Sequence, residues 1–475
     1  MKHFFIITAI SCMIVLVIAS CTNVTVEEEK TNLEKESLHS LLLEKGTTPI
    51  TADEAINVAR IFDINQGRPQ TKAETDFADV YTLNNEEGMP IIYAVNYTDN
   101  QGFVLVSASR NYYPILAYSE KGRFDENYHD SGLEVWVYQQ ENNIRWLNSN
   151  ITKEQSALFH AAWAPYEATS PIMNLPGTKS GNLIDVRDSL ITAWEAQGYS
   201  WTSLSERPDG LPASTYNNWC SSAQSIAHTD YDYLENSIIF YKTVVNSHSS
   251  AYATVTSEWA QDCPYNLSLP YYANGNQAYA GCATIALGQI MRYHGCPSTY
   301  NWNLMPDVCY YSNSTVESFI SDLFDDFILS SYYLTGHSSA KPIGTIASIL
   351  ESDYDYDVSY GGHNTSTVMS SLSNGNPVYM SGITPYSMMG HAWVCDGYNQ
   401  NIYVKTFTLM VLSQVDPPLH YEFLADYTGD AGSTTYYSMN WGEGGNYNGM
   451  YLDNAFYPGA DYSNSRTDMY LNPLN

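Results

Sequence analysis

One apolar segment restricts the fold of this chain more than any other. Residues 283–293 are mostly apolar, with Gly281 and Cys282 before them and Gly295 and Pro297 behind them. A glycine turn in front and a glycine and proline behind predict a buried helix over this run. Cys282 then stands at the helix N-terminus, where free backbone N–H groups favour the nucleophilic thiolate. From its position alone, Cys282 is better explained as a small buried side chain that opens a helix.

Two later segments are expected to carry polar side chains on strands. His391 follows Gly390 and begins a short apolar run, which predicts a strand that turns at Asp396-Gly397. Asn440 and Trp441 end another predicted strand, and a glycine-rich turn follows them. A rigid strand can hold an imidazole in place, so His391 is a candidate for chemistry rather than only for packing.

The order cysteine, histidine, asparagine supports nucleophilic acyl chemistry. Cys282 would attack an acyl carbon, while His391 would take the thiol proton and later deliver a proton to the leaving amine. The Asn440 amide would orient the imidazole, with Trp441 shielding that hydrogen bond from water. Upstream, the Gln261 amide would donate to the oxyanion together with the backbone N–H of Cys282.

Five strings in this region resemble the streptopain family of bacterial cysteine peptidases, a branch of the papain-like fold. They are WAQDCPYN, GCATIALGQIMRYHGCP, YNWNLM, GHAWVCDGY and MNWGEGGNYNGMY. The resemblance covers roughly residues 256–457 and implies an α+β fold with a helical lobe and a β-sheet lobe. It also implies an endopeptidase that acts on proteins or peptides through a thioester, without metal or cofactor.

The resemblance assigns a role to each candidate site residue. It implies that Cys282 is the nucleophile, His391 the base and Gln261 the oxyanion donor. Asn440 and Trp441 would support the histidine, and Gly390 would lie beside the substrate cleft.

One position departs from the family pattern. The family usually has a second tryptophan where this chain has Glu443, so that a carboxylate there would alter specificity or weaken catalysis.

Other polar residues near these strings are weaker candidates. Asp396 would be an alternative orienting carboxylate, and Cys395 is expected to pack in the core. His294 is twelve residues beyond Cys282, about 18 Å along a helix, and is too far away to be the base. We expect His337 and His363 on the surface, in polar loops.

The N-terminal half predicts a small α+β domain over residues 51–170. Thr51 and Glu54 form a capping box at a helix start, 90–97, 102–108 and 115–118 are expected strands, and 132–150 an expected helix. The part up to Asp125, with GFVLVSASRNYYPILAYSEKGRFD, is similar to the inhibitory propeptide of the same family. The resemblance implies an intramolecular inhibitor of the peptidase.

The remaining segments complete the expected organisation. Residues 171–181 are a Pro/Gly/Ser-rich linker, 182–250 are an unassigned insertion or connection, and 251–475 are the catalytic domain. Six cysteines remain beyond the N-terminal region: Cys220, Cys263, Cys282, Cys296, Cys309 and Cys395. If one of them is a free nucleophile, at least one other cannot pair, and the spacings predict no zinc site.

The N-terminus predicts export. Residues 1–20 have the apolar core of a secretory signal, and Val17-Ile18-Ala19-Ser20-Cys21 resembles a bacterial lipobox. Cys21 would then carry lipid, and residues 21–50 would tether a cell-envelope lipoprotein to a membrane, facing the periplasm or the cell exterior. The alternative is an ordinary signal peptide that contains a cysteine.

Composition excludes some partners. The 475-residue chain has 51 Asp and Glu against 20 Lys and Arg, a formal net charge of −31. Phosphate-backbone binding needs clustered basic residues, so nucleic acid is not an expected partner.

Three functional hypotheses remain open. The leading one is an exported, lipid-anchored cysteine endopeptidase made as a zymogen. The second is a transglutaminase-like acyltransferase, in which an aspartate completes the Cys282–His391 pair. The third is a catalytically impaired surface lipoprotein that binds polymers through its tyrosines and asparagines.

Overall fold

A computed structural model gives the structure of the chain. It describes residues 49–65, 77–128, 132–167, 183–227, 230–272, 274–329, 339–383, 390–412, 420–453 and 466–474. The expected signal peptide, the lipidation site Cys21, most of the tether, the linker 171–181 and His337 lie outside these residues. No helix among the described residues has the length and apolarity needed to cross a membrane.

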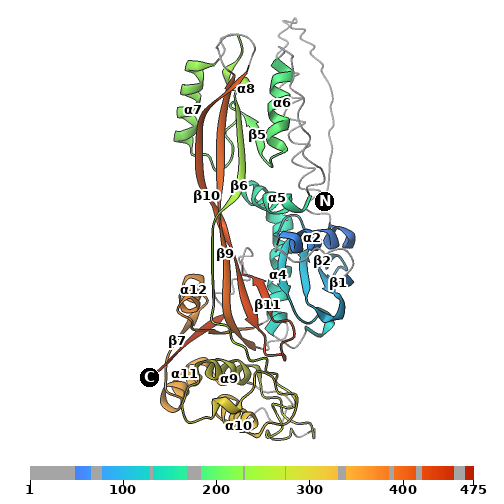
Figure 1. Cartoon of the computed structure of the whole chain (residues 1–475), viewed down its shortest axis with the longest axis vertical. Coiled ribbons are helices and arrows are strands. Elements are labelled where there is room, and N and C mark those ends of the chain that lie inside the picture. The colour runs from blue at the N-terminus through green and yellow to red at the C-terminus, as the bar shows by residue number, and fades with distance from the viewer. Residues whose placement is uncertain are drawn as a thin grey trace, which may run out of the picture. The chain divides into compact units, whose positions relative to one another are not determined.

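One antiparallel sheet runs through the described part of the chain (Figure 1). Twelve strands belong to it, in the order β1-β2-β3-β4-β11-β10-β9-β8-β12-β7, with β6 joined to β9 and β5 joined to β6. The long strand β9 (Gly390–Leu412) pairs along one edge with β10 (Tyr421–Asn440). Its other edge pairs first with β8 (Val378–Ile383) and then with β6 (Ile238–Tyr252).

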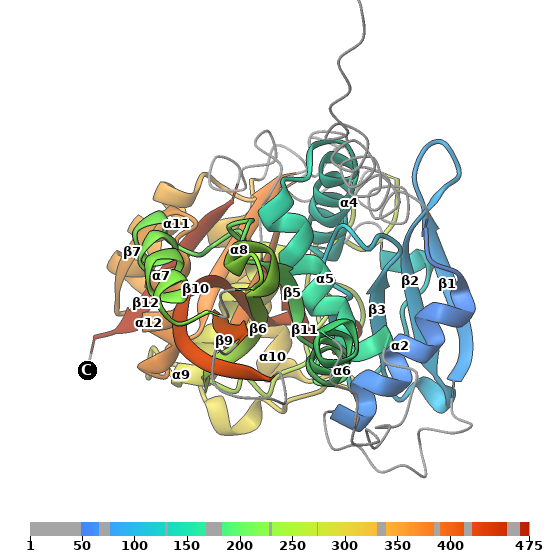
Figure 2. The ribbon, with the colours of Figure 1, turned by 90° about the horizontal axis from the view of Figure 1, so that it is seen from above.

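The N-terminal region folds as the sequence predicts. Its strands are β1 (Phe77–Asn84), β2 (Pro90–Tyr97), β3 (Phe103–Ser107) and β4 (Ile115–Ser119), and its helices are α2 (Ala52–Asn65), α4 (Gly132–Asn150) and α5 (Lys153–Glu167), with short 3-10 turns at Thr98–Asn100 and Glu126–Tyr128. The capping box is confirmed, because the Thr51 N–H donates to Glu54 at 2.7 Å and the Glu54 N–H donates to Thr51 Oγ1 at 3.2 Å. Helix α2 lies across β1–β3 (Figure 2) and buries one face of that sheet. Strand β1 and helix α5 are additions that the sequence patterns missed.

The other face of this region shares its core with the C-terminal part. Strand β4 pairs with β11 (Gly449–Leu452) through Tyr118 and Met450, so the two sheets are continuous. The indole of Trp136 on α4 donates to the carbonyl oxygen of Leu452 at 2.9 Å. The N-terminal domain is therefore packed against the peptidase part rather than only linked to it.

Residues 183–252, unassigned by sequence, form an arm with the far halves of β9 and β10. Their elements are α6 (Leu183–Glu195), β5 (Ser200–Ser203), α7 (Ala213–Ile226), α8 (Tyr233–Asn236) and β6. Helix α7 packs through Trp219 against Phe407 and Leu409 of β9, while α6 packs with Phe240 of β6. Because β6 pairs with β9 over its whole length, the boundary expected at residue 251 falls inside a strand and is not a structural boundary.

The remaining elements form the helical lobe and close the sheet. They are α9 (Cys282–His294), a 3-10 turn (Trp302–Leu304), α10 (Ser314–Phe327), α11 (Ile343–Asp353), β7 (Tyr356–Gly362), α12 (Thr365–Ser373) and β12 (Thr467–Pro473). Helix α9 is buried as predicted, and its bounds match the expected run: Gly281 precedes it with φ of 86° and Gly295 ends it in the left-handed conformation. A helical lobe and a β-sheet lobe, preceded by a small α+β domain, give the expected α+β, papain-like fold.

The strand that carries His391 corrects one expectation. We expected it to turn at Asp396-Gly397, but β9 continues straight through this point to Leu412. The register with β10 shifts there, because Ser438 pairs with Gly397 and Met439 with Cys395. Asp396 is therefore the extra residue of a β-bulge, which a short-range pattern of Asp and Gly does not distinguish from a turn.

Candidate active site

Cys282 is the first residue of α9 and lies against the start of β9. Its Sγ is 4.0 Å from the carbonyl oxygen of Gly390, and the N–H of Ala392 also points at the thiol. Ala392 and Val394 share a core cluster with Ala283 of α9. The structure thus brings the expected nucleophile to the backbone on both sides of His391.

The surroundings of Cys282 affect its ionisation in two directions. Burial raises the pKa of the Cys282 thiol and is the largest influence, and the charge of Glu443 adds to it. The N–H groups of Ala392, Ala283 and Cys282 itself lower the pKa, as expected for a helix N-terminus, but they do not outweigh burial. In this structure the net effect of these surroundings favours the neutral thiol.

His391 is the second residue of β9, as predicted, and is buried. It pairs with Gly382 of β8, and directly paired residues of an antiparallel sheet project to the same face. A Cβ on Gly382 would lie 3.0 Å from Val135 of α4. His391 therefore projects toward α4, whereas α9 packs on the alternate residues Ala392 and Val394.

Asn440 is the last residue of β10 and is buried, but its bonds lead elsewhere than expected. Its Nδ2 donates to the Ser257 carbonyl oxygen at 2.8 Å and to Gln289 Oε1 at 3.2 Å. Gln289 Nε2 donates back to Asn440 Oδ1 at 3.3 Å, and so does the Gly442 N–H at 3.2 Å. In this structure Asn440 ties β10 to α9, and its role in orienting His391 stays a prediction.

Gln289 is a site residue that the sequence reasoning missed. It is fully buried, seven residues after Cys282 on the same helix, and its Oε1 also accepts the N–H of Trp259 at 3.1 Å. The sequence did contain a signal for it, namely a single amide side chain in an otherwise apolar predicted helix, two turns after the nucleophile. A buried amide needs hydrogen-bond partners, so its position indicates a polar contact of the helix.

Trp441 packs among aromatic rings and Gly390 lies at the surface, and the roles expected for both stay predictions. The Trp441 ring is buried, with its centroid 5.2 Å from that of Trp393 and 5.0 Å from that of Tyr451. A Cβ on Gly132, at the start of α4, would lie 2.9 Å from both Trp393 and Trp441. Gly390 is exposed at the beginning of β9. The first turn of α4 thus covers the ring expected to shield the histidine.

Gln261, the expected oxyanion donor, is bound to Glu443. Its Nε2 donates to Glu443 Oε1 at 3.0 Å. The loop before α9 and the turn after β10 are also joined by their backbones, because Ala260 bridges to Glu443 and the Gly444 N–H donates to the Trp259 carbonyl oxygen at 3.1 Å. Glu443, the residue that departs from the family pattern, is therefore hydrogen-bonded to the predicted oxyanion donor.

The other sequence candidates lie in the core. Asp396 accepts the N–H of Val255 at 3.0 Å, and burial raises the pKa of its carboxyl to about 6. Cys395 is fully buried in the core, as expected. His294 ends α9, where burial lowers its pKa to about 4 and Tyr356 is its hydrogen-bond partner at 3.2 Å.

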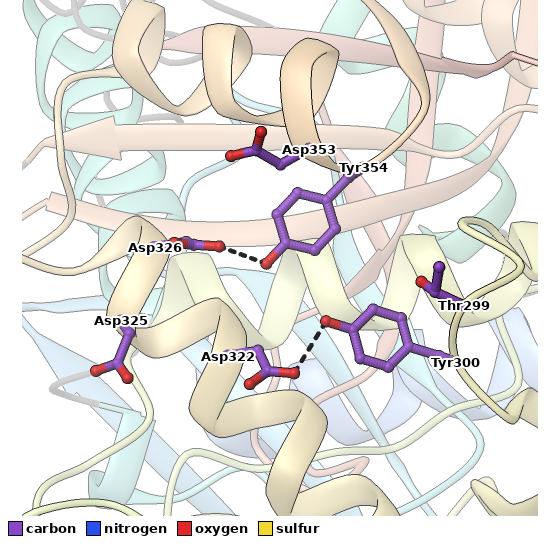
Figure 3. A pocket seen from close by; sticks show the side chains of 7 residues that line it. All are labelled: Thr299, Tyr300, Asp322, Asp325, Asp326, Asp353 and Tyr354. Atoms are coloured by element: carbon purple, nitrogen blue, oxygen red, sulfur yellow. Dashed lines mark hydrogen bonds between the residues drawn. The ribbon is translucent and has the colours of Figure 1, made fainter.

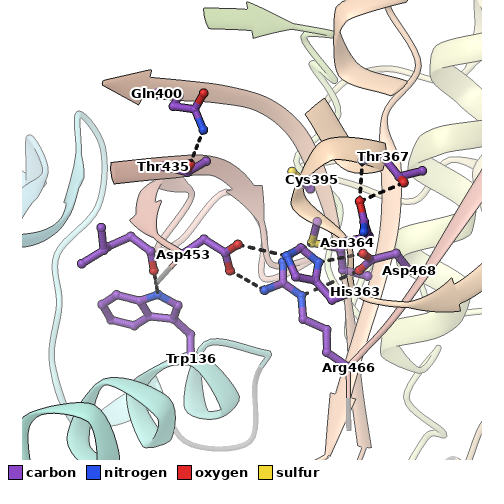
Figure 4. Close-up of polar contacts among 12 residues, drawn as sticks. Trp136, His363, Asn364, Thr367, Cys395, Gln400, Thr435, Asp453, Arg466 and Asp468 are labelled. Atoms are coloured by element: carbon purple, nitrogen blue, oxygen red, sulfur yellow. Dashed lines mark hydrogen bonds and ion pairs between the residues drawn. The ribbon is translucent and has the colours of Figure 1, made fainter. Parts of the chain in front are cut away.

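His363 was expected on the surface, and this expectation is wrong. It follows β7 and is nearly buried between two carboxylates (Figure 4). Nδ1 is 2.7 Å from Asp468 Oδ2 and Nε2 is 3.0 Å from Asp453 Oδ2. Arg466 pairs with Asp453 at 2.5 Å. Burial and Arg466 oppose a charged imidazole, but the two carboxylates prevail and raise the pKa of His363.

Two surface hollows lie outside this cluster of site residues. One, of about 290 Å³, is lined by Thr299, Tyr300, Asp322, Asp325, Asp326, Asp353 and Tyr354 (Figure 3). The Tyr300 hydroxyl donates to Asp322 at 3.0 Å and the Tyr354 hydroxyl to Asp326 at 2.6 Å. The other, of about 460 Å³, is lined by residues between 262 and 279, in the loop that joins Gln261 to α9.

Neither metal binding nor disulfide pairing is built into the described residues. Within them, no group of His, Cys, Asp and Glu side chains has a geometry that would hold a metal ion. The six cysteines of this part are all free thiols, and Cys263 is exposed.

Two known protein families match consecutive parts of the chain. Residues 47–144 match the Spi protease inhibitor family, and residues 259–299 and 298–451 match the peptidase C10 family. The chain is similar to the thiol protease/hemagglutinin PrtT of Porphyromonas gingivalis, with 25% identity over 247 residues, which are 42% of this chain. It spans 23% of that curated relative.

Two solved structures from Prevotella intermedia are also similar. A mutant fragment of prointerpain A aligns over 82% of this chain and 97% of its own length, with 16% identity and a TM-score of 0.41. The active cysteine protease interpain A aligns over 46% of this chain and 94% of its own length, with 21% identity and a TM-score of 0.31.

The two family matches place an inhibitor domain in front of a peptidase domain, in the order that the fold shows. The chain thus contains a peptidase C10, or streptopain, domain over residues 259–451, and an inhibitor domain of the Spi type over residues 47–144 precedes it.

Proposed function

We propose that this chain is a cysteine endopeptidase made as a zymogen. The observation that carries the proposal is that the chain segments of three predicted residues meet at one helix end. Cys282 opens α9, the start of β9 with His391 lies against it, and the loop with Gln261 precedes it, since the Ala280 N–H donates to the Gln261 carbonyl oxygen at 2.8 Å.

The proposed reaction uses these groups in sequence. His391 takes the proton of Cys282, and Sγ forms a bond to the carbonyl carbon of a peptide. The amide of Gln261 and the Cys282 N–H stabilise the oxyanion. The C–N bond then breaks as His391 gives its proton to the leaving amine, and water hydrolyses the thioester to free the thiol.

The inhibitor domain supports the zymogen part of the proposal. His391 projects to the face of the sheet that α4 covers, and α4 also packs against Trp393 and Trp441. The Cys282 thiol meanwhile contacts backbone of β9. Activation requires the imidazole to reach the Cys282 side once α4 leaves.

An ion pair and a hydrogen bond also hold the edge of the inhibitor domain against the peptidase part. Lys121 pairs with Glu258 at 2.6 Å, and the Tyr447 hydroxyl donates to Asp125 at 3.1 Å. In the peptidase part, Glu258 lies three residues before Gln261, and Tyr447 lies four residues after Glu443. Removal of the inhibitor domain thus changes the surroundings of the oxyanion donor as well.

We also propose that the chain is exported and anchored by lipid at Cys21. The support is the signal-like run of residues 1–20 and the small residues that precede the cysteine. Replacing Cys21 with Ser is expected to move the protein from the membrane fraction to the soluble fraction. A native protein that is fully soluble with an unmodified N-terminus would contradict the anchor.

The test of the activity is hydrolysis of an unfolded protein under reducing conditions, after limited proteolysis of the full chain. The parent should cleave it, and Cys282→Ala should not. Cys263→Ser is the matched control, because it removes an exposed thiol that the proposed reaction does not use. Failure of both the parent and the control to cleave any protein would overturn the proposed activity.

A further inference from the structure

The bond between Gln261 and Glu443 is built into the site rather than made by two loose side chains. Nε2 and Oε1 are 3.0 Å apart. The Ala260–Glu443 bridge and the Gly444–Trp259 hydrogen bond of 3.1 Å hold the two backbones side by side. Gln261 is half-buried, so water competes only weakly for its amide.

The Glu443 carboxylate also acts on the nucleophile. Its charge is one of the influences that raise the pKa of the Cys282 thiol. A negative charge that disfavours the thiolate also disfavours an oxyanion formed on the carbon that Cys282 attacks. One side chain therefore opposes both charges that the proposed reaction creates.

Other charged groups surround this carboxylate. Glu258, from the loop before α9, lies against Gly445 and is paired with Lys121 of the inhibitor domain. Tyr447, from the same turn as Glu443, feels its charge together with those of Asp125 and Arg123. Among these groups, Glu443 is the one whose carboxylate is bonded to the Gln261 amide.

We propose that Glu443 is a positioning residue of the peptidase reaction: its side chain accepts one N–H of the Gln261 amide and fixes that amide in an orientation that restrains its donation to the oxyanion. The inference rests on the proposed function. Because this bond restrains the Gln261 amide, it acts on the step in which the oxyanion forms.

The consequence for the rate follows from the value of one oxyanion donor. Removing such a donor costs about 100-fold to 1,000-fold in kcat. Gln261 held by Glu443 is partly removed in this sense, so freeing it raises kcat without adding any contact to the ground-state substrate. KM is expected to stay the same.

The test is a double-mutant cycle on the full chain activated by limited proteolysis. Glu443→Ala should raise kcat at neutral pH at least about tenfold, with little change in KM. The same substitution in a Gln261→Ala background should give no gain. Glu443→Gln, which keeps the shape and a neutral acceptor, should give a smaller gain in kcat. Asp262→Asn, which changes an exposed neighbouring carboxylate, is the control and should keep the kcat of the parent.

A gain that persists without Gln261 would overturn the proposal, and so would a lower kcat in Glu443→Ala with unchanged Tm. The rate of Cys282 alkylation against pH provides a readout that needs no hydrolysis. Glu443→Ala should shift this profile to lower pH. If the profile shifts but no variant hydrolyses a peptide, the proposed peptidase activity has failed, while the effect of Glu443 on the nucleophile stands. If the profile of an active protein does not shift, the proposed effect of Glu443 on Cys282 is wrong.

Discussion

Individual residues of the site are held by partners far away in the sequence. Asn440 reaches Gln289 across 151 positions and Ser257 across 183. The sequence strings predicted that Asn440 and the helix of Cys282 belong to one site, and both lie there. The amide pair with Gln289 could not be predicted, because a local pattern carries no information on which distant strand end faces a helix.

Asn440→Ala is expected to lower kcat and leave measurable hydrolysis, because Asn440 positions other groups and does not react. Gln289→Ala should lower kcat as well. The double variant should raise the activation free energy by less than the sum of the two single increases, since the two amides bond to each other. Peptide hydrolysis by the activated proteins measures this. Additive losses in kcat would show that Asn440 does not act through Gln289.

Asp396 provides a residue-scale test of the acyltransferase alternative. Burial raises the pKa of its carboxyl to about 6, so the stability it provides is present below its unfolded pKa and is lost as pH rises through about 6. Asp396→Asn should therefore raise the free energy of unfolding at pH 7.5, by about 3 kcal/mol at most, and much less at pH 4.5; thermal unfolding at the two pH values measures this. Hydrolysis should persist.

Asp426→Asn, an exposed position on β10, is the control for that experiment. A loss of activity in Asp396→Asn larger than that in Asn440→Ala would favour the transglutaminase-like hypothesis instead.

At the scale of elements, the buried ion cluster joins the ends of three strands. His363 follows β7, Asp453 follows β11, and Asp468 belongs to β12 (Figure 4). The partners of His363 are 90 and 105 positions away, which explains why its polar local sequence suggested a surface loop. Charged groups are buried only when paired, and both partners of His363 are distant in the sequence.

His363→Gln is expected to destabilise the protein most at mildly acidic pH. Because the folded protein raises the pKa of His363, this stabilisation is complete below the unfolded pKa and is lost as pH rises through the folded value. Removing one member of a buried ion network costs about 3–5 kcal/mol. Tm should fall clearly at pH 6 and less at pH 9, whereas the exposed His420→Gln should change little. Equal losses at both pH values would contradict a charged His363.

Helix α4 is the element that links inhibition to the site. A side chain at Gly132 would meet the rings of Trp393 and Trp441 at 2.9 Å, so Gly132→Val overpacks this contact. Overpacking costs about 1–3 kcal/mol, and loosened α4 should raise the hydrolysis rate of the uncleaved chain about tenfold. Gly361→Val, where a Cβ would meet nothing within 4 Å, is the control. An unchanged rate with a lowered Tm would show that α4 does not restrain the site.

At the scale of the whole molecule, the sequence predicted the two domains but not how they join. The helices and strands at 52–65, 90–97, 132–150 and 282–294 have strong local caps and periodicity, and they agree with the structure. The β4–β11 pairing connects positions more than 300 residues apart and creates one continuous sheet. The arm of residues 183–252 likewise depends on pairing with β9, which no local pattern reveals.

In the proposed mechanism, the inhibitor domain keeps a cysteine peptidase inactive by holding His391 on the α4 face of the sheet. The most direct test is the rate of hydrolysis of a peptide substrate by the full chain, measured before and after limited proteolysis in the segment between α5 and α6, at residues 168–182. Cys282→Ala, treated in the same way, gives the background. We expect the intact chain to be nearly inactive. Cleavage should raise the rate of peptide hydrolysis strongly, and Cys282→Ala should show no such rise. Equal rates before and after cleavage would contradict this mechanism.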